Sequence, residues 1–201
     1  MIYLNNYGWN DKLSQLKQES TYNALTHGRI SIVHRTCYEV VSENGLFQCE
    51  LTGNMMYGKS DFELPCTGDW VLFQPFDEHK GIIVDMLPRE RTLYRKKNGT
   101  VADKQAIASY VDKAFIVQSL DDNFNVRRAE RFMVQMQEEN INPVLVFNKA
   151  DLGFDEQKVE EQIRHIARQI PVFFTSIHQP QTILQLRESI SAGETVVFVG
   201  S

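Results

Sequence analysis

The stretch NPVLVFNKAD, residues 142–151, joins a strand-like run to a cluster of polar residues. Residues 143–147 are apolar or aromatic, which is typical of a buried strand. The run ends in an amide, an ammonium and a carboxylate, which Asn148, Lys149 and Asp151 carry. In open α/β sheets, ligands bind at the carboxyl ends of the strands. The stretch therefore predicts a binding site at the end of a buried strand.

Strands and helices alternate on both sides of this stretch. Further strands are expected in KAFIVQSL (113–120), PVFF (171–174) and TVVFV (195–199). One helix is expected in residues 127–140, and another in residues 182–190, where Gly193 is placed to end it. Asp155 is a suitable N-cap for a further helix, whose apolar face would carry Val159, Ile163, Ile166 and Ile170. This alternation predicts a mostly parallel sheet covered by helices on both faces.

The N-terminal part of the chain has a different pattern, with short strands following one another. They are expected in RISIVHR (29–35), YEVVS (38–42), LFQCEL (46–51), DWVLFQ (69–74) and GIIVDML (81–87). Asn44-Gly45 predicts a hairpin with a type I′ turn, which requires φ > 0 at both central residues. Five short strands in so short a segment predict a small barrel. An OB-fold is the leading interpretation, and an SH3-like barrel is the alternative.

The whole chain is therefore expected to be α+β, with an OB-type barrel followed by a partial α/β domain. The expected division is a leader at 1–26 with a helix in DKLSQLKQE, a barrel at 27–88, a basic linker at 89–104 and the α/β domain at 105–201. The linker, RERTLYRKKNGTVADK, has six basic and two acidic residues and is expected to be exposed. Its candidates for RNA contact are Arg89, Arg91, Arg95, Lys96 and Lys97.

Composition excludes several classes of protein. The 201 residues carry a net charge of −5, which argues against a wholly basic nucleic-acid binder but allows a local basic strip. No run approaches the ~18 apolar residues of a membrane span, and the first residues show no signal-peptide pattern, so no membrane association is expected. Cys37, Cys49 and Cys66 form no CxxC pair, which favours a reduced cytoplasmic compartment and no zinc site within this chain.

The polar end of the opening stretch fits a guanine base. A carboxylate has acceptors only, so Asp151 can accept both the ring N1–H and the exocyclic amine of guanine. Adenine has an acceptor at that ring nitrogen, so its lone pair would face those of the carboxylate. Asn148 can hold the other edge of the base, and the aliphatic stem of Lys149 can lie on its face. Asn and Asp are also common in turns and helix caps, so the position after a buried strand is what favours base recognition.

Two later pairs of residues extend this hypothesis. Thr175 and Ser176 follow the next predicted strand, where a hydroxyl with nearby backbone N–H groups could touch the guanine oxygen, or simply form a strand-to-loop pair. Gly200 and Ser201 follow the last predicted strand, as at the start of a phosphate-binding loop, G-x-x-x-x-G-K-[ST]. A single Gly after a strand is a weak motif.

Taken in order, these segments resemble the circularly permuted ribosome-assembly GTPases of the RsgA, or YjeQ, family. The similarity runs over essentially the whole chain. It is carried by YGWN (7–10), TGDWV (67–71), LPRERTLYR (87–95), KQAIASYVDKAFIV (104–117), RRAERFMV (127–134), NPVLVFNKADL (142–152) and ETVVFVGS (194–201). The resemblance implies an OB-fold, a P-loop GTPase domain with its motifs in rotated order, and a C-terminal zinc-binding domain. Base recognition then precedes the phosphate loop, which explains why NKAD comes late in the chain.

The resemblance also assigns roles to residues. Guanine contacts are implied for Asn148, Lys149, Asp151, Thr175 and Ser176, and phosphate contacts for Gly200 and Ser201. The chain departs from the family pattern at three places. Ile177 stands where a small Ala is usual, Tyr110 where Asn is usual, and LTGNMMYGKS (51–60) has only Lys59 where several Arg and Lys are common.

The resulting expectation is a cytoplasmic, monomeric GTPase that uses GTP or GDP with Mg²⁺ in late maturation of the small ribosomal subunit. Its barrel would contact rRNA. No catalytic or metal-binding residue is assigned to residues 1–201, because the rest of the phosphate loop, the switch motifs and the Zn²⁺ ligands are expected after Ser201. The 201-residue chain is therefore expected to be inactive by itself. One alternative is an RNA-binding OB-fold module on an α/β scaffold without nucleotide hydrolysis. The other is a P-loop kinase or ATPase, which Asp151 disfavours.

Overall fold

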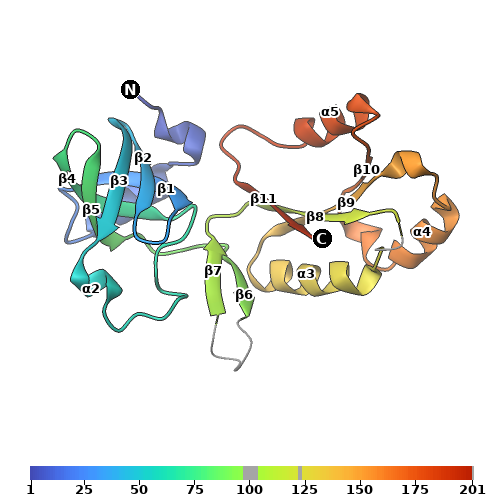
Figure 1. Cartoon of the computed structure of the whole chain (residues 1–201), viewed down its shortest axis with the longest axis horizontal. Helices are drawn as coiled ribbons and strands as arrows, with labels where there is room; N and C mark the ends of the chain where they lie inside the picture. The colour runs from blue at the N-terminus through green and yellow to red at the C-terminus, as the bar shows by residue number, and fades with distance from the viewer. Residues whose placement is uncertain (97–103, 122–123, 201) are drawn as a thin grey trace. The chain divides into compact units, whose positions relative to one another are not determined.

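The computed structural model describes residues 1–96, 104–121 and 124–200. The chain divides into two compact units, Met1–Val111 and Asp112–Ser201. The first unit contains a closed barrel and a separate two-stranded hairpin, and the second contains a four-stranded sheet with helices (Figure 1). Two candidate residues, Lys97 and Ser201, lie outside the described residues.

Five strands close the barrel. They are β1 (Thr26–Val33), β2 (Tyr38–Ser42), β3 (Gly45–Leu51), β4 (Trp70–Asp77) and β5 (Lys80–Met86). Their order is β1-β2-β3-β5-β4, and β4 pairs with β1 to complete the circle. Strands β3 and β5 are parallel, and the other neighbours are antiparallel. This arrangement confirms the predicted five-stranded OB-type barrel.

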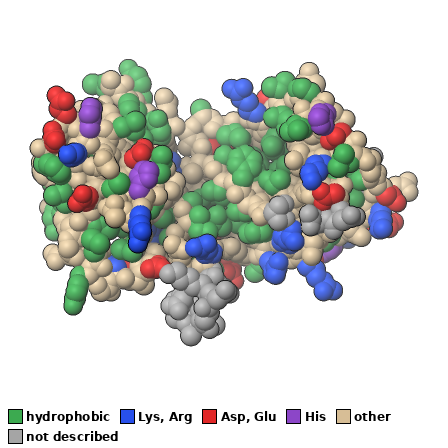
Figure 2. All heavy atoms as spheres, in the orientation of Figure 1, with side chains coloured by type: hydrophobic (Ala, Val, Ile, Leu, Met, Phe, Trp, Pro, Cys, Tyr) green, Lys and Arg blue, Asp and Glu red, His purple; other side chains and the backbone are tan. Residues whose placement is uncertain are grey.

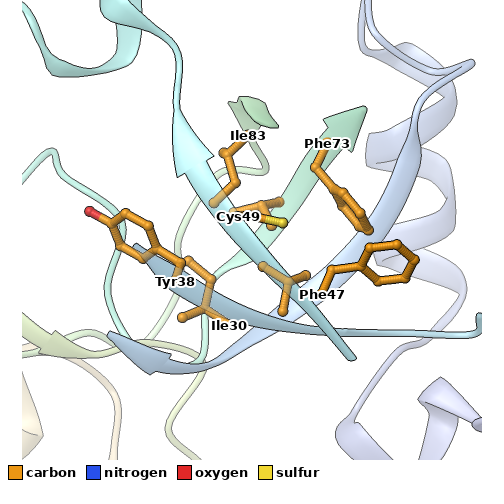
Figure 3. Packing of buried hydrophobic residues seen from close by; sticks show 8 residues of the cluster. Ile30, Tyr38, Phe47, Cys49, Phe73 and Ile83 are labelled. Carbon is orange, nitrogen blue, oxygen red and sulfur yellow. The ribbon is translucent and has the colours of Figure 1, made fainter. Parts of the chain in front are cut away.

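Alternate side chains of these strands fill the barrel interior (Figure 3). On β3, Phe47 and Cys49 are buried whereas Gln48 and Glu50 are exposed, so successive side chains point to opposite faces of the strand. The rings of Phe47 and Phe73 lie 5.2 Å apart. The buried cluster consists of Ile30, Tyr38, Val40, Phe47, Cys49, Val71, Phe73 and Ile83. Because the strands close on one another, these residues form one apolar core without leaving a sheet edge.

The hairpin between β2 and β3 differs from the predicted type I′ turn. Ser42 pairs with Gly45, so the two loop residues are Glu43 and Asn44. Gly45 has a φ of +127°, whereas Asn44 is not among the positive-φ residues. The Ser42 hydroxyl accepts from the Asn44 N–H and donates to the Gly45 carbonyl, both at 3.2 Å. This local hydrogen bonding stabilises a turn shifted by one residue from the predicted one.

The N-terminal segment packs on the outside of the barrel. It forms the 3₁₀ helix η1 (Leu4–Tyr7) and the helix α1 (Asp11–Glu19), and the short helix α2 (Gly53–Met56) follows β3. The Asn10 side chain caps α1 by accepting from the Leu13 N–H at 3.1 Å. Leu4 and Leu13 belong to a second buried cluster with Val41, Trp70, Leu72, Leu87 and Tyr110. The predicted helix is confirmed, and the segment contributes to the core of the first unit.

Part of the basic segment at 89–104 is a hairpin. Strand β6 (Leu93–Lys96) pairs antiparallel with β7 (Lys104–Ala108). Both strands belong to the first unit, and Thr67 forms an isolated bridge with Ala108. The Lys104 ammonium lies 3.9 Å from the centre of the Tyr94 ring, which is a cation–π contact.

The second unit alternates strands with helices as predicted. Its elements are β8 (Lys113–Ser119), α3 (Val126–Glu138), β9 (Asn142–Asn148), η2 (Ala150–Leu152), α4 (Glu156–Ile163), η3 (Ala167–Gln169), β10 (Val172–Thr175), α5 (Pro180–Glu188) and β11 (Val196–Gly200). The sheet order is β10-β9-β8-β11, and every pair is parallel. All four strands therefore present their carboxyl ends at the same edge of the sheet.

Helices cover both faces of this sheet (Figure 1). On one face, Ala129 of α3 and Val159 and Ile163 of α4 pack on Ile116, Leu120, Leu145 and Phe147. On the other face, Leu186 of α5 packs near Phe115, Val144 and Val146. This second face is less completely covered, as the 61% exposure of Phe198 on β11 shows. Figure 2 shows hydrophobic side chains on the visible face around β11.

Two helices end earlier than the sequence pattern predicted. Helix α4 ends at Ile163, because the Ile166 N–H bonds to the Ile163 carbonyl at 2.9 Å and tightens the chain into a turn. Helix α5 ends at Glu188, five residues before Gly193. Gly193, with a φ of +81°, belongs instead to the loop that leads into β11. None of the helices in the described ranges has the length and apolar character needed to cross a membrane.

Candidate functional site

The polar residues of NKAD lie at the carboxyl end of β9. Asn148 is the last residue of the strand, and Lys149 has the left-handed conformation, with φ +63° and ψ +34°. This conformation turns the chain into η2, which contains Asp151. The Leu152 N–H donates to the Lys149 carbonyl at 3.1 Å, and the Leu120 N–H donates to the Asn148 carbonyl at 2.9 Å. The turn thus holds three polar side chains at the edge of the sheet.

Thr175 and Ser176 lie beside these residues. Thr175 ends β10 directly opposite Asn148 in the parallel register, and its hydroxyl donates to Asn148 Oδ1 at 3.3 Å. A hydrogen bond from the Ser176 side chain is the main cause that lowers the pKa of Asp151 below its usual value. Asp151 itself is exposed, whereas Thr175 and Ser176 are buried. The structure therefore brings all five candidate guanine contacts together.

The loop that carries Ser176 is fixed by its own hydrogen bonds. The Ser176 N–H donates to the Thr182 hydroxyl at 3.1 Å, and the Ser176 hydroxyl accepts from the His178 N–H at 3.0 Å. Ile177 stands where a small residue was expected. It is 77% exposed, so its side chain does not enter the core. The unusual residue is therefore compatible with a well-formed loop, with the Ser176 hydroxyl beside Asp151.

Gly200 lies at the same edge of the sheet, at the end of β11. It pairs with Val117 of β8 and has a φ of +145°. A Cβ atom at this position would lie 1.9 Å from the Val117 carbonyl oxygen, so no residue with a side chain fits without a backbone shift. This close approach and the positive φ explain why glycine occupies the position. Ser201 follows outside the described residues.

One pattern match was missed by the sequence analysis. Residues 53–60, GNMMYGKS, fit the phosphate-loop pattern G-x-x-x-x-G-K-[ST]. The structure does not give them that role, because the helix α2 lies inside the pattern instead of starting after the lysine. Ser60 donates through both its N–H and its hydroxyl to Glu63, at 2.9 and 2.8 Å, and Lys59 lies 3.8 Å from the same carboxylate. Glu63 thus occupies the donors that a phosphate would use.

The candidate RNA contacts of the basic segment divide into distinct environments. Arg89 is an ion-pair partner of Asp69, with side chains only 10% and 0% exposed, so it is not part of an exposed arm. Arg91, with a φ of +45°, donates from Nε to the Val111 carbonyl at 3.0 Å. Arg95 is exposed on β6 and donates from Nε to Gln105 Oε1 at 3.0 Å. Lys96 ends the same strand. The expectation of an exposed arm is therefore wrong for Arg89, because the carboxylate of Asp69 draws its guanidinium into the core.

The part of the chain that the structure describes contains no preformed metal site. Among the residues that the structure describes, no group of three or more His, Cys, Asp or Glu side chains could hold a metal ion. Cys37, Cys49 and Cys66 are free thiols, and burial raises the pKa of Cys49 and of Cys66 to about 12. These two thiols are therefore protonated and unreactive near neutral pH.

Comparisons with known proteins agree on one family. Residues 86–201 match the family described as RsgA GTPase. The chain is 73% identical over 195 residues to a Bacteroides thetaiotaomicron protein named small ribosomal subunit biogenesis GTPase RsgA 1, covering 97% of this chain and 55% of that protein. It is 32% identical over 197 residues to the RsgA protein of Methanosarcina acetivorans, covering 96% and 52%. The chain thus spans about half the length of the curated relatives it matches.

Two solved structures share the fold. The structure titled as YloQ, a circularly permuted GTPase, matches with a TM-score of 0.61 and 22% identity, over 91% of this chain and 62% of that one. YjeQ from Thermotoga maritima matches with a TM-score of 0.66 and 23% identity, over 88% and 60%. The barrel followed by a parallel sheet is therefore a fold already seen in YjeQ and in the circularly permuted GTPase YloQ.

Proposed function

Because this chain belongs to the RsgA GTPase family, we propose that the whole protein binds GTP and GDP and hydrolyses GTP during late maturation of the small ribosomal subunit. In this proposal the barrel contacts rRNA, and the nucleotide switches the affinity for the particle. The protein acts as a monomer in the cytoplasm. Family membership favours this function over an RNA-binding module without nucleotide chemistry.

The observation that carries the proposal is the group of polar side chains at the carboxyl ends of β9 and β10. Asp151 is exposed, and its pKa is lowered, mainly by the Ser176 hydroxyl, so it is ionised at neutral pH. An ionised carboxylate accepts hydrogen bonds and donates none. It therefore suits the two adjacent donors of guanine and repels the ring acceptor of adenine. Asn148, held by Thr175, is available for the other edge of the base.

The phosphates and Mg²⁺ would be held by residues other than those that contact the base. Gly200 provides a backbone without a side chain at the same sheet edge, which suits the close approach of a phosphate group to main-chain N–H groups. Bound Mg²⁺ would neutralise the charge of the phosphates during transfer. In the family the lysine and hydroxyl that complete such a site follow the first glycine of the loop. No Zn²⁺ site is proposed among the described residues.

A change in nucleotide preference from GDP to XDP tests the proposal. Asp151→Asn replaces one acceptor by a donor, so guanine loses a partner, whereas xanthine has a carbonyl in place of the amine and gains one. In a full-length form, GDP affinity should fall by about tenfold to a hundredfold, and XDP affinity should rise. Titration calorimetry with both nucleotides measures the exchange.

Asp155→Asn is the matched control, because Asp155 is a nearby exposed aspartate that caps α4 and asparagine caps equally well. It should leave both affinities unchanged. An Asp151→Asn variant that keeps its preference for GDP would remove Asp151 from the base site and overturn the assignment.

A further inference from the structure

A carboxylate that the sequence pattern did not single out holds Lys149. The Lys149 ammonium lies 2.7 Å from Asp121 Oδ2. The other oxygen, Asp121 Oδ1, accepts from the Ser119 hydroxyl at 2.7 Å. Ser119 and Asn148 are paired at the ends of β8 and β9. The contacts among Ser119, Asp121 and Lys149 therefore tie together the loops that follow two neighbouring parallel strands.

The backbone of Lys149 requires such support. Its left-handed conformation is unfavourable for a residue with a side chain, and such residues persist where the surroundings fix them. The carbonyl of Lys149 accepts from the Leu152 N–H, and the carbonyl of Asn148 accepts from the Leu120 N–H. The Asp121 ion pair adds a side-chain anchor to these two backbone bonds. All three contacts act on the turn that orients Asn148 and Asp151.

We propose that Asp121 is a positioning residue for the base-recognition loop and that it acts through Lys149; this inference rests on the proposed guanine site. The ion pair fixes the direction of the Lys149 side chain, so its aliphatic stem and the turn are ordered before the base arrives. Ordering in advance reduces the entropy lost on binding. The two side chains are 26% and 50% exposed, so the pair adds little to global stability. We expect the ion pair to affect the order of the loop and the affinity for the nucleotide.

The first test measures the loop without any ligand, in a full-length form. Amide hydrogen exchange is compared for wild type, Asp121→Asn, Lys149→Met and the double variant. Both single variants should exchange the Leu120 and Leu152 amides faster, and the double variant should be no faster than Lys149→Met alone. Unchanged exchange at both amides in Asp121→Asn would overturn the inference, whatever the protein binds.

Glu194→Gln is the matched control. Glu194 pairs with Lys113 at the same distance, 2.7 Å, but at the start of β8, the opposite end of the strand from Ser119. It should leave exchange at Leu120 and Leu152 unchanged. Thermal unfolding of all variants should agree closely, which separates local loosening of the loop from a general loss of stability.

The second test measures GDP affinity of the same four proteins. Asp121→Asn should weaken binding about threefold to tenfold, the cost of ordering one long side chain on binding. The same substitution should have no further effect in the Lys149→Met background, because Asp121 acts through Lys149. An equal additional loss in that background would overturn the role of Lys149 as intermediary. A wild-type protein that binds no GDP would instead contradict the proposed function. The hydrogen-exchange measurement would still show whether Asp121 orders the loop.

Discussion

Asp69 is a fully buried carboxylate, and Arg89 is the cation that makes its burial possible. Arg89 Nε lies 2.8 Å from Asp69 Oδ1, and Arg89 Nη2 lies 2.6 Å from Asp69 Oδ2. The guanidinium also donates to the carbonyls of Phe62 and Leu64, and Asp69 accepts from the Cys66 N–H at 2.7 Å. The pair therefore ties the loop before β4 to the segment after β5, and it satisfies several polar groups inside the first unit.

Removing one partner of this pair should be costly. Arg89→Met leaves the Asp69 carboxylate buried without its cation, so the free energy of unfolding should fall by about 3–5 kcal/mol. Urea unfolding followed by circular dichroism measures the change. Lys12→Met is the control, because the pair of Lys12 with Glu90 is largely exposed and should contribute less than about 1 kcal/mol. Equal effects of the two substitutions would contradict the structural role of Arg89.

Tyr110 shows how one residue compensates for a strained backbone. Its φ is +54°, a conformation in which Asn is the more usual residue. The side chain is buried in the cluster with Leu4, Leu13 and Trp70, and its hydroxyl donates to the Pro88 carbonyl at 2.6 Å. Packing and this hydrogen bond outweigh the strain. The departure from the family pattern thus has a local physical explanation.

Tyr110→Asn should therefore destabilise the first unit even though Asn tolerates the backbone better. Loss of a buried aromatic side chain costs about 3–5 kcal/mol, and relief of strain returns about 1 kcal/mol, so a net loss of about 2–4 kcal/mol is expected. Tyr110→Phe keeps the ring and should cost only about 1 kcal/mol. Thermal or urea unfolding separates the two variants. A more stable Tyr110→Asn protein would show that strain, and not packing, dominates at this position.

At the scale of elements, local patterns predicted most of what was found. The apolar runs of β8 to β11 predicted these strands, because burial on both faces of a sheet leaves a direct mark in the sequence. Features that depend on distant partners left no such mark. Arg89 looked like part of an exposed basic segment because Asp69 lies 20 residues away. Asp121 gave no sign of pairing with Lys149, 28 residues later. The candidate base-site residues could be proposed from the sequence because NKAD follows its strand directly.

The basic segment around β6 gives a prediction at the same scale. Arg95, Lys96 and Lys97 remain candidates for phosphate contacts, whereas Arg89 is excluded by its buried ion pair. If these three cations bind rRNA, replacing all three by Ala should reduce the slope of log affinity against log salt by about 2–3, because each phosphate contact contributes about 0.7–0.9. Binding of a full-length form to small subunits at several salt concentrations measures the slope.

A control with the same charge change is available in the second unit. Lys158, Arg164 and Arg168 are exposed, and their replacement by Ala also removes three positive charges. This control should keep the wild-type slope if the contact belongs to β6 and the residues after it. Equal reductions by the two triple variants would assign the salt dependence to overall charge and not to this segment.

At the scale of the whole molecule, the proposed function assigns base recognition and phosphoryl transfer to different parts of the protein. Residues 1–201 contain the guanine-site candidates, but their single match to G-x-x-x-x-G-K-[ST] lies in the barrel, where Lys59 and Ser60 are engaged by Glu63. Phosphoryl transfer depends on a lysine at the phosphates, a hydroxyl on Mg²⁺ and a group that orients the water.

A chain of residues 1–201 should therefore release no phosphate from GTP above background, whereas a full-length form should turn GTP over. Lys59→Ala in the full-length form should keep that turnover, because Lys59 pairs with Glu63 and not with a nucleotide. Phosphate release measured side by side decides the matter. Turnover by the short chain, or its loss in full-length Lys59→Ala, would place the phosphate site in the loop after β3 and reverse the assignment made from Gly200.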